Sequence, residues 1–215
     1  MKKARINIIS KLTLVSIILL VVFGCSKKDK TNTPMKSGFN LKKGTYNISN
    51  AESKLTWVGK QLSTKEHKGT MDSIKGEIII NSEGIINGII EVDMNSINVT
   101  DLQGGPKYSL ERHLKSSDFF NVKGFPAASI KFQENNKLSN TGISCDGQLT
   151  IKNITHPISF KVDILEATDN IKAKTTLTFD RSKYDVRFGS GKFFENLGDK
   201  LIYDNIDLSV LIVTD

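Results

Sequence analysis

Alternation of apolar and polar residues along the chain constrains its fold more than any other feature. In residues 206–212, Ile, Leu, Val and Ile occupy every second position. The same period recurs in residues 54–59, 74–80 and 90–95. A period of two gives each strand one apolar face and one polar face, which is typical of antiparallel sheets. The pattern therefore predicts an all-β domain.

Eight such runs are separated by turn residues rich in Asn, Asp, Gly and Ser. They cover residues 45–58, 70–81, 86–98, 127–134, 142–152, 157–167, 170–181 and 203–213. Only Lys107–Lys115 has helical features, because Pro106 precedes it and Leu110 and Leu114 are spaced i, i+4. Eight strands with mostly short connections predict one closed sheet or one sandwich, with one short helical insertion.

The first 24 residues are expected to be a signal peptide. Four basic residues precede an apolar run from Leu12 to Phe23, which is too short for a comfortable membrane span. The run ends in Val-Phe-Gly-Cys25, which resembles the lipobox of bacterial lipoproteins, where the cysteine is acylated. An ordinary signal peptide or an anchored helix is the alternative.

Residues 25–43 would then comprise a lipidated Cys25 and a flexible tether, and residues 44–215 the folded domain. The tether is polar and lysine-rich, and a flexible coil of this length spans about 25 Å. Loss of the signal removes four of the 30 basic residues, which leaves 26 against 23 acidic residues. The mature charge is thus near neutral, so a nucleic-acid partner is not expected.

The chain has two cysteines, Cys25 and Cys145. Acylation of the first would leave no intrachain disulfide. Cys145 is expected to be an inert, half-buried strand residue rather than a reactive thiol.

Catalytic and metal-binding signatures are missing from the sequence. It has no G-x-S-x-G, P-loop or H-E-x-x-H motif. Its three histidines, His67, His113 and His156, lie in different segments without metal-ligand spacing. We therefore predict no catalytic residue, no metal site and no cofactor.

Phenylalanines are the informative residues, since there are eleven of them beside a single tryptophan. Several lie in connections rather than strand centres, among them Phe119, Phe120, Phe188, Phe193 and Phe194. An eight-stranded barrel is either filled by side chains or holds one small ligand. Rings at strand ends would line a mouth for an apolar ligand, and the alternative is that they fill a core.

Four stretches resemble the YceI family of bacterial secreted proteins, and the resemblance covers about residues 44–213. They are residues 46–69, 113–128, 147–158 and 179–184, with motifs such as His-Leu-Lys-Ser-Ser-Asp-Phe-Phe and Gly-Gln-Leu-Thr. The resemblance implies an eight-stranded antiparallel lipocalin-like barrel with a helical insertion. It also implies a long apolar tunnel that binds polyisoprenoid or other long-chain amphiphilic lipid, without catalysis. The sequence departs from the family at Gly104-Gly105-Pro106 and in the longer connection Arg187–Lys200.

On that fold, residues on the inward face of the barrel are expected to line the tunnel. They are Trp57 (or Leu55), Ile90, Val92, Phe119, Phe120, Phe132, Phe179, Leu208 and Val210. His113 and Arg181 are candidates for polar groups at the mouth. For Arg181, a clamp to a neighbouring carboxylate or loop carbonyl is the favoured alternative.

The expected function is therefore passive storage, transport or sensing of a lipid. A hydrolase with its site at the barrel mouth, and a structural or interaction module with a solid core, remain alternatives. Acylated Cys25 would anchor the protein in the cell envelope, at the outer membrane, facing the periplasm or the cell surface. A homodimer is left open.

Overall fold

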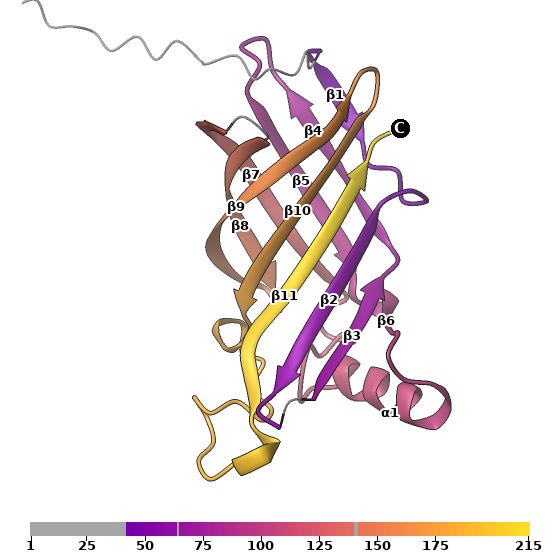
Figure 1. Ribbon diagram of the computed structural model, residues 1–215, viewed down its shortest axis with the longest axis vertical. Helices are drawn as coiled ribbons and strands as arrows, with labels where there is room; N and C mark the ends of the chain where they lie inside the picture. The colour runs from indigo at the N-terminus through magenta and orange to yellow at the C-terminus, as the bar shows by residue number, and fades with distance from the viewer. Residues whose placement is uncertain (1–41, 64, 140–141) are drawn as a thin grey trace, which may run out of the picture. The chain divides into compact units, whose positions relative to one another are not determined.

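A single antiparallel sheet dominates the computed structural model, which describes residues 42–63, 65–139 and 142–215 (Figure 1). The strands follow the order β1-β4-β5-β7-β8-β9-β10-β11-β2-β3-β6 in the sheet. Their bounds are β1 Gly44–Asn47, β2 Lys54–Gln61, β3 Glu66–Met71, β4 Ile74–Ile80, β5 Ile86–Asp93, β6 Ile97–Val99, β7 Ala127–Ser139, β8 Gly142–Ile151, β9 Ile154–Ala167, β10 Ile171–Asp180 and β11 Ile202–Val213.

The eleven observed strands follow the same chain path as the eight predicted ones. The first three predicted strands are each interrupted once, giving β1 and β2, β3 and β4, and β5 and β6. Between β5 and β6 lies the short 3-10 helix η1 (Met94–Ser96), which Asp93 caps by accepting a hydrogen bond from the Asn95 amide. A period-two pattern does not reveal such bends, because every second side chain faces inward both before and after the interruption. The eight-stranded lipocalin-like architecture is confirmed, with three bent strands.

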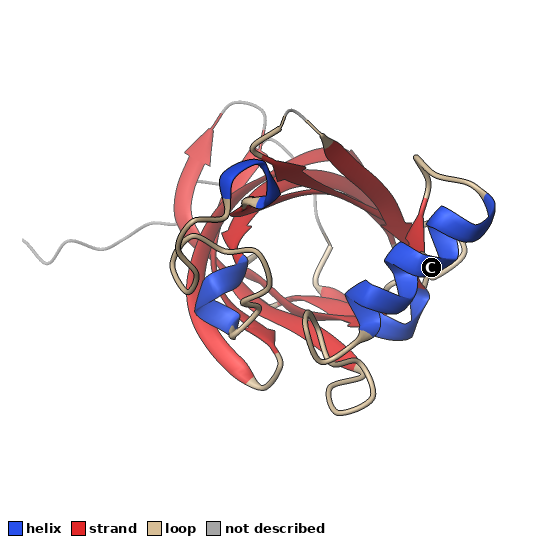
Figure 2. Ribbon diagram, turned by 90° about the horizontal axis from the view of Figure 1, so that it is seen from below, coloured by secondary structure: helices blue, strands red, loops and turns tan. Residues whose placement is uncertain are grey.

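The sheet curls into a barrel, as Figure 2 shows in a view along it. Its edge strand β1 approaches the end of β11. Ile48 forms an antiparallel bridge with Thr214. On either side, the Ser49 amide donates to the Val213 carbonyl at 2.8 Å, and the Asp215 amide to the Asn47 carbonyl at 2.9 Å. These ladder pairs, and the apolar clusters inside the barrel, join residues between 44 and 215.

The other edge strand, β6, lies beside the helix α1 (Gly104–Lys115), which begins three residues before its predicted start. Glu111 accepts a hydrogen bond from the Val99 amide at 2.9 Å, and Lys107 Nζ donates to Asn98 Oδ1 at 2.7 Å. The helix therefore covers the free edge with side-chain hydrogen bonds. Within the described ranges, no helix has the length and apolar character needed to cross a membrane.

A seam interrupts the ladder between β9 and β10. Residues 171–175 of β10 pair with residues 162–167 of β9. Beyond this point the described ladder pairs join residues 154–161 to β8, and residues 176–180 to β11. Pro157 lies in the half of β9 that has no β10 partner, where its missing N–H costs no ladder hydrogen bond on that side.

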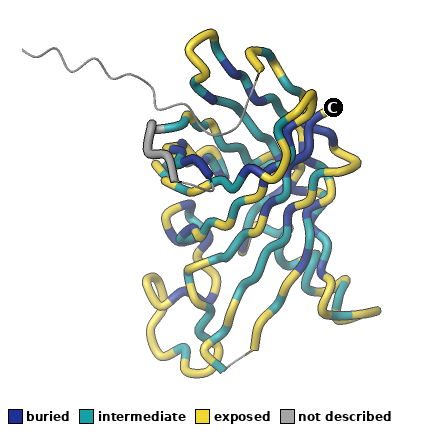
Figure 3. The backbone as a smooth tube through the Cα atoms, turned by 45° about the horizontal axis from the view of Figure 1, so that its top comes forward, coloured by how far each residue is buried: buried dark blue, intermediate teal, exposed yellow. Residues whose placement is uncertain are grey.

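The two ends of the barrel carry different elements (Figure 1). One end, called here the isoleucine end, carries β1, the β4–β5 turn and the β9–β10 turn. Its buried residues include Ile78, Ile80, Ile86, Ile143 and Ile171. The other end, called here the aromatic end, carries α1, the β2–β3 turn and residues 185–201. Figure 3 shows exposed residues in the turns and at intervals along the strands between the two ends, where they alternate with buried or half-buried ones.

Candidate functional site

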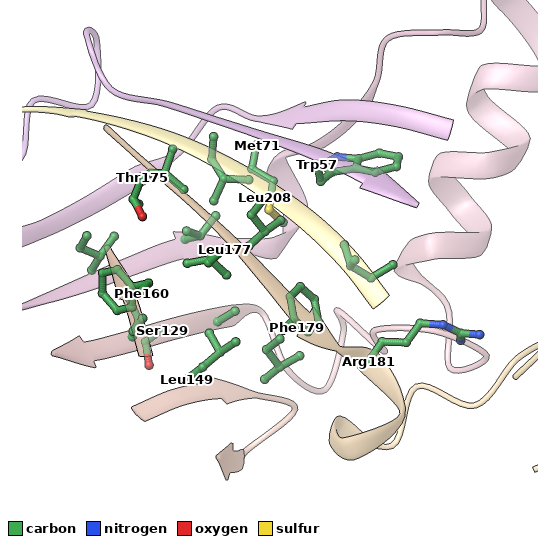
Figure 4. Close-up of a pocket in the computed structure, with 18 of the residues that line it drawn as sticks. Trp57, Met71, Ser129, Leu149, Phe160, Thr175, Leu177, Phe179, Arg181 and Leu208 are labelled. Atoms are coloured by element: carbon green, nitrogen blue, oxygen red, sulfur yellow. The ribbon is translucent and has the colours of Figure 1, made fainter. Parts of the chain in front are cut away.

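The barrel contains an apolar cavity of about 270 Å³. Its wall is built from α1 and from ten strands, β2 to β11, because the alternation of each strand turns one apolar face inward. Figure 4 shows side chains such as Leu149, Leu177, Phe179 and Leu208 converging on this space. The cavity reaches from Arg181 and Phe119 at the aromatic end to Ile143 and Ile171 at the isoleucine end. It is therefore long and narrow.

All nine residues expected to line a tunnel lie in the wall of this cavity. They are Trp57, Ile90, Val92, Phe119, Phe120, Phe132, Phe179, Leu208 and Val210, and Leu55 lies there too. Seven of the nine stand on strands, where the alternation already fixed their direction. Phe119 and Phe120 follow α1 and are held by backbone hydrogen bonds to Ser116 and Leu114. That these side chains contact a ligand stays a prediction.

Many wall residues were not among those predictions, chiefly aliphatic ones. They include Met71, Ile78, Ile86, Leu110, Leu114, Ile143, Leu149, Ile151, Phe160, Val162, Ile164, Ile171, Leu177 and Ile212. For the residues on strands, the same alternation indicates an inward direction. Predictions that favoured aromatic residues missed these aliphatic ones, although isoleucines make up much of the cavity wall at the isoleucine end.

The largest group of polar residues in the cavity wall lies beside the β2–β3 turn and comprises Lys60, Gln61, Lys65 and His67. Ser129, Lys174 and Thr175 line the cavity singly or in a pair on β7 and β10. His67 Nδ1 lies 2.8 Å from Asp101 Oδ2. Burial alone would raise the pKa of Asp101, but hydrogen bonds from the Lys68 amide and from His67 outweigh it and lower that pKa. This group of polar side chains marks a mouth at the aromatic end. Sequence patterns gave no sign of it, since the turn looks like any exposed polar loop.

Arg181 lies in the cavity wall with a side chain only 1% exposed. Its Nε, Nη1 and Nη2 donate to the carbonyls of Tyr203, Val186 and Ile202 at 3.3, 3.0 and 3.1 Å. Nη2 also lies 3.3 Å from Asp204 Oδ1. Burial lowers the pKa of Arg181, while the nearby carboxylates oppose that shift. With its donors engaged, the guanidinium acts as the clamp that sequence reasoning favoured over a contact with ligand.

His113 lies outside the cavity wall, contrary to its candidacy as a mouth group. Its ring packs edge-on between Phe119 and Phe188, with centroids 4.9 and 4.6 Å apart. Its Nε2 lies 3.2 Å from Asp118 Oδ2. The sequence placed His113 correctly at the end of the helix. The direction of the ring is set by the later Phe188, which local patterns cannot foresee.

The groups needed for covalent chemistry are not assembled in the part of the chain that the structure describes. No cluster of three or more His, Cys, Asp or Glu residues could hold a metal ion there. Cys145 is fully buried rather than half-buried, and burial raises the pKa of its thiol to about 12. Such a thiol is a poor nucleophile near neutral pH. Cys25 and the tether lie outside the described residues.

The seam between β9 and β10 forms part of the cavity wall. On its outer side is a groove whose lining includes Ser159, Lys161, Thr176 and Thr178. Phe160, Leu177 and Leu208 line both this groove and the cavity. Side chains rather than a backbone ladder therefore close the barrel at this place.

Comparisons with known proteins agree with this architecture. A family model described as a YceI-like domain matches residues 46–214. Similar solved structures include Burkholderia cenocepacia BcnA, at 17% identity and a TM-score of 0.63, covering 78% of this chain and 99% of that one. Another is a polyisoprenoid binding domain from Saccharophagus degradans implicated in plant cell wall breakdown, at 13% identity and a TM-score of 0.60, covering 79% and 97%.

A third is the Campylobacter jejuni YCEI protein, at 18% identity and a TM-score of 0.53, covering 96% of this chain and 99% of that one. At such identities the likeness shows the fold alone. No curated protein matches the sequence.

Proposed function

The chain belongs to the family of YceI-like domains, and from this premise and the shape of the cavity we propose that it binds one long-chain amphiphilic lipid, such as a polyisoprenoid. The observation that carries the proposal is a long, narrow and almost wholly apolar cavity with a group of polar side chains at its aromatic end. The Saccharophagus degradans neighbour, described as polyisoprenoid-binding, supports the same ligand class.

The lipid chain would lie along the barrel and its head group would stay at the aromatic end. Burial of apolar surface contributes about 25 cal/mol per Å², so a long chain gains more from the cavity than a short one. A head group buried among the isoleucines would lose its hydrogen bonds with water. Near the mouth it meets Lys65 and His67 instead. A cavity at the lower edge of the about 300–1000 Å³ common for ligand sites suits a single extended chain.

Binding in this proposal is passive. The one thiol in the wall region is protonated and buried, and Arg181 is held by backbone carbonyls. The protein would store, carry or sense the lipid in the cell envelope, anchored through acylated Cys25. A solid-core module is a weaker alternative, because such a module has no need of a cavity that runs from one end of the barrel to the other.

Native mass spectrometry, combined with organic extraction of the purified chain beginning at Ser26, tests the proposal. We expect a hydrophobic compound to leave the protein with the organic phase, and long-chain lipids to raise the melting temperature of the emptied protein. A protein that carries nothing and gains no thermal stability from any long-chain lipid contradicts the proposal. Turnover of an ester that His113→Gln abolishes, with lipid retention intact, would favour the hydrolase.

Trp57 offers a direct measure of binding. It is the only tryptophan of the chain and lies in the cavity wall, so its fluorescence reports on the cavity alone. Titration with a long-chain lipid should change the emission of the wild-type protein and saturate at one lipid per protein.

A further inference from the structure

The connection of residues 185–201 exposes three phenylalanines. Phe188, Phe193 and Phe194 are 43%, 42% and 49% exposed, whereas Ser190 in the same connection is fully buried. Leu62 in the β2–β3 turn and Tyr203 at the start of β11 are similarly exposed. These five residues are called here the aromatic rim. A monomer rarely exposes several large apolar side chains together without a partner.

The rings of the aromatic rim are exposed because the backbone of the connection is fixed. Ser190 Oγ donates to Asp204 Oδ2 at 3.0 Å, and the Ser190 carbonyl accepts from the amides of Phe193 and Phe194 at 3.1 Å. Lys192 Nζ bonds to the carboxylate of Asp180 and, at 2.9 Å, to Ser182 Oγ. The hydroxyl of Ser190 and the amine of Lys192 are thus held against the barrel. Phe188 packs against His113 and Phe119, and part of its ring, like those of Phe193 and Phe194, stays exposed.

The aromatic rim is continuous with the cavity. Phe188 stands 5.3 Å from Phe119, ring centroid to ring centroid, and Phe119 lines the cavity. On the other side, the Leu62 amide donates to the Leu201 carbonyl at 2.9 Å, which brings the β2–β3 turn and its mouth residues against the same connection. An apolar path therefore leads from exposed rings to buried ones.

We propose that the aromatic rim docks on the surface of a lipid bilayer and that the lipid enters and leaves the barrel there. This inference rests on the proposed function, because a long-chain lipid is scarcely soluble and must come from or go to a membrane. Phenylalanine and tyrosine rings are favoured at the boundary between head groups and acyl chains. Docking by this end would put the cavity mouth against the membrane and shield the lipid from water throughout the transfer.

Apolar insertion rather than charge would drive the docking. The connection holds three cations and three acidic residues, and two of the cations are paired, Arg187 with Asp185 and Lys192 with Asp180. Charge near the rim is therefore largely compensated within the protein, and a zwitterionic bilayer should suffice. Added salt should change the binding little, since screening acts on unpaired surface charges.

Leu165 provides a matched control for the rim residues. It is a large apolar residue on β9, toward the isoleucine end, and is 44% exposed. Its exposed fraction is close to those of the rim residues, but it lies away from the aromatic end. Neither Leu165 nor Phe193 and Phe194 lines the cavity, so their substitution leaves the lipid site intact.

Flotation with phosphatidylcholine vesicles tests the inference, with the chain beginning at Ser26 so that no anchor is present. We expect the wild-type protein to float with the vesicles, and Phe193→Ala/Phe194→Ala to lower its partition by about tenfold or more, as removal of two inserted rings requires. Leu165→Ala should float as the wild type does. Lipid retained through extraction should be the same in all three proteins, and only the rate of transfer between vesicles should fall in the rim variant.

Two results would overturn the docking while leaving the lipid site in place: a rim variant that floats like the wild type, or a wild-type protein that carries lipid but never floats. A self-association that the rim variant loses, without any vesicle binding, would assign the surface to a second copy of the chain. A wild-type protein that neither floats nor carries lipid refutes the proposed function as well.

Discussion

The two ends of the barrel are closed by different means. At the isoleucine end, the ladder between β9 and β10 is present and the bridge between Ile48 and Thr214 joins the edges of the sheet. At the aromatic end that ladder is missing, and buried side chains hold the connection after β10 against the barrel. Backbone pairing needs no particular residue, whereas the aromatic end depends on individual side chains. Substitutions should therefore have unequal effects at the two ends.

The largest effect is expected from Arg181→Met at the aromatic end. It removes hydrogen bonds to three carbonyls and leaves Asp204 without its buried cation. Loss of one partner of a buried pair costs about 3–5 kcal/mol. Urea denaturation followed by circular dichroism should show a loss of this size.

Arg187→Met is the matched control, because Arg187 is exposed and its pair with Asp185 lies at the surface. Its effect should stay within about 0.5 kcal/mol. If Arg181→Met proves as mild as Arg187→Met, the aromatic end does not depend on the clamp and the contrast between the ends is wrong.

The fold was predictable because its information is local and repetitive. Alternation in a stretch such as residues 206–212 identifies both a strand and its inward face, so the tunnel-lining residues on strands could be placed without a structure. Phe119 and Phe120 needed the family resemblance as well, since they lie in a connection.

What escaped prediction depends on contacts between distant segments. The contacts of Arg181 with residues 202–204 and of His113 with Phe188 each join residues that are far apart in the sequence. The mouth near Lys65 lies in one turn, but its place at the end of the cavity is set by the other strands. The seam escaped for another reason, since residues 154–161 and 176–180 look like ordinary strands. Whether two strands pair is decided by the twist and tilt of the whole barrel.

Filling the cavity from either end should alter lipid selection differently. Ala173 lies in the cavity wall on β10 near the isoleucine end, and Ala128 on β7 near the aromatic end. Ala173→Phe should shorten the longest chain that binds, since it blocks only the deep part of the cavity. Ala128→Phe should weaken the binding of every chain length, since each chain must pass it. Titrations of Trp57 fluorescence with lipids of increasing length measure both effects.

Ala127→Phe is the control for these variants, because Ala127 is exposed and absent from the cavity wall. It should bind lipids as the wild type does. Equal loss across all chain lengths in Ala173→Phe would show that the lipid does not extend to the isoleucine end.

Acid should loosen the aromatic end. Burial alone would raise the pKa of Asp180, but hydrogen bonds from Lys192 and Ser182 outweigh it and hold that pKa below its ordinary value. A lowered pKa in the folded state stabilises the fold above the unfolded pKa of about 4, and the gain is lost as the pH falls through the folded value. The melting temperature should therefore decrease as the pH is lowered from 7 to 3. Lys192→Met should show a weaker dependence, and an unchanged dependence would argue against this ion pair.

The smallest effect, of opposite sign, is expected at the isoleucine end. Glu134 is half-buried and pairs across the ladder with the fully buried Cys145. Burial raises the pKa of Glu134, and a hydrogen bond from the Ile86 amide opposes the shift only in part. A raised pKa means that the folded state holds the proton more tightly than the unfolded state. Stability is therefore greatest below the unfolded pKa of about 4.3 and declines as the pH rises through the folded value.

Glu134→Gln removes that decline, so it should raise the melting temperature at pH 7 and leave it nearly unchanged at pH 4. Glu83→Gln, at an exposed position in the β4–β5 turn, should change neither value. The sign of the difference separates the two ends, because the aromatic end is stabilised by the charged form of the partly buried Asp180, whereas the isoleucine end favours the neutral form of Glu134. A variant that is less stable than the wild type at pH 7 would mean that the charge on Glu134 is compensated inside the barrel. The isoleucine end would then depend on a specific polar contact, as the aromatic end does.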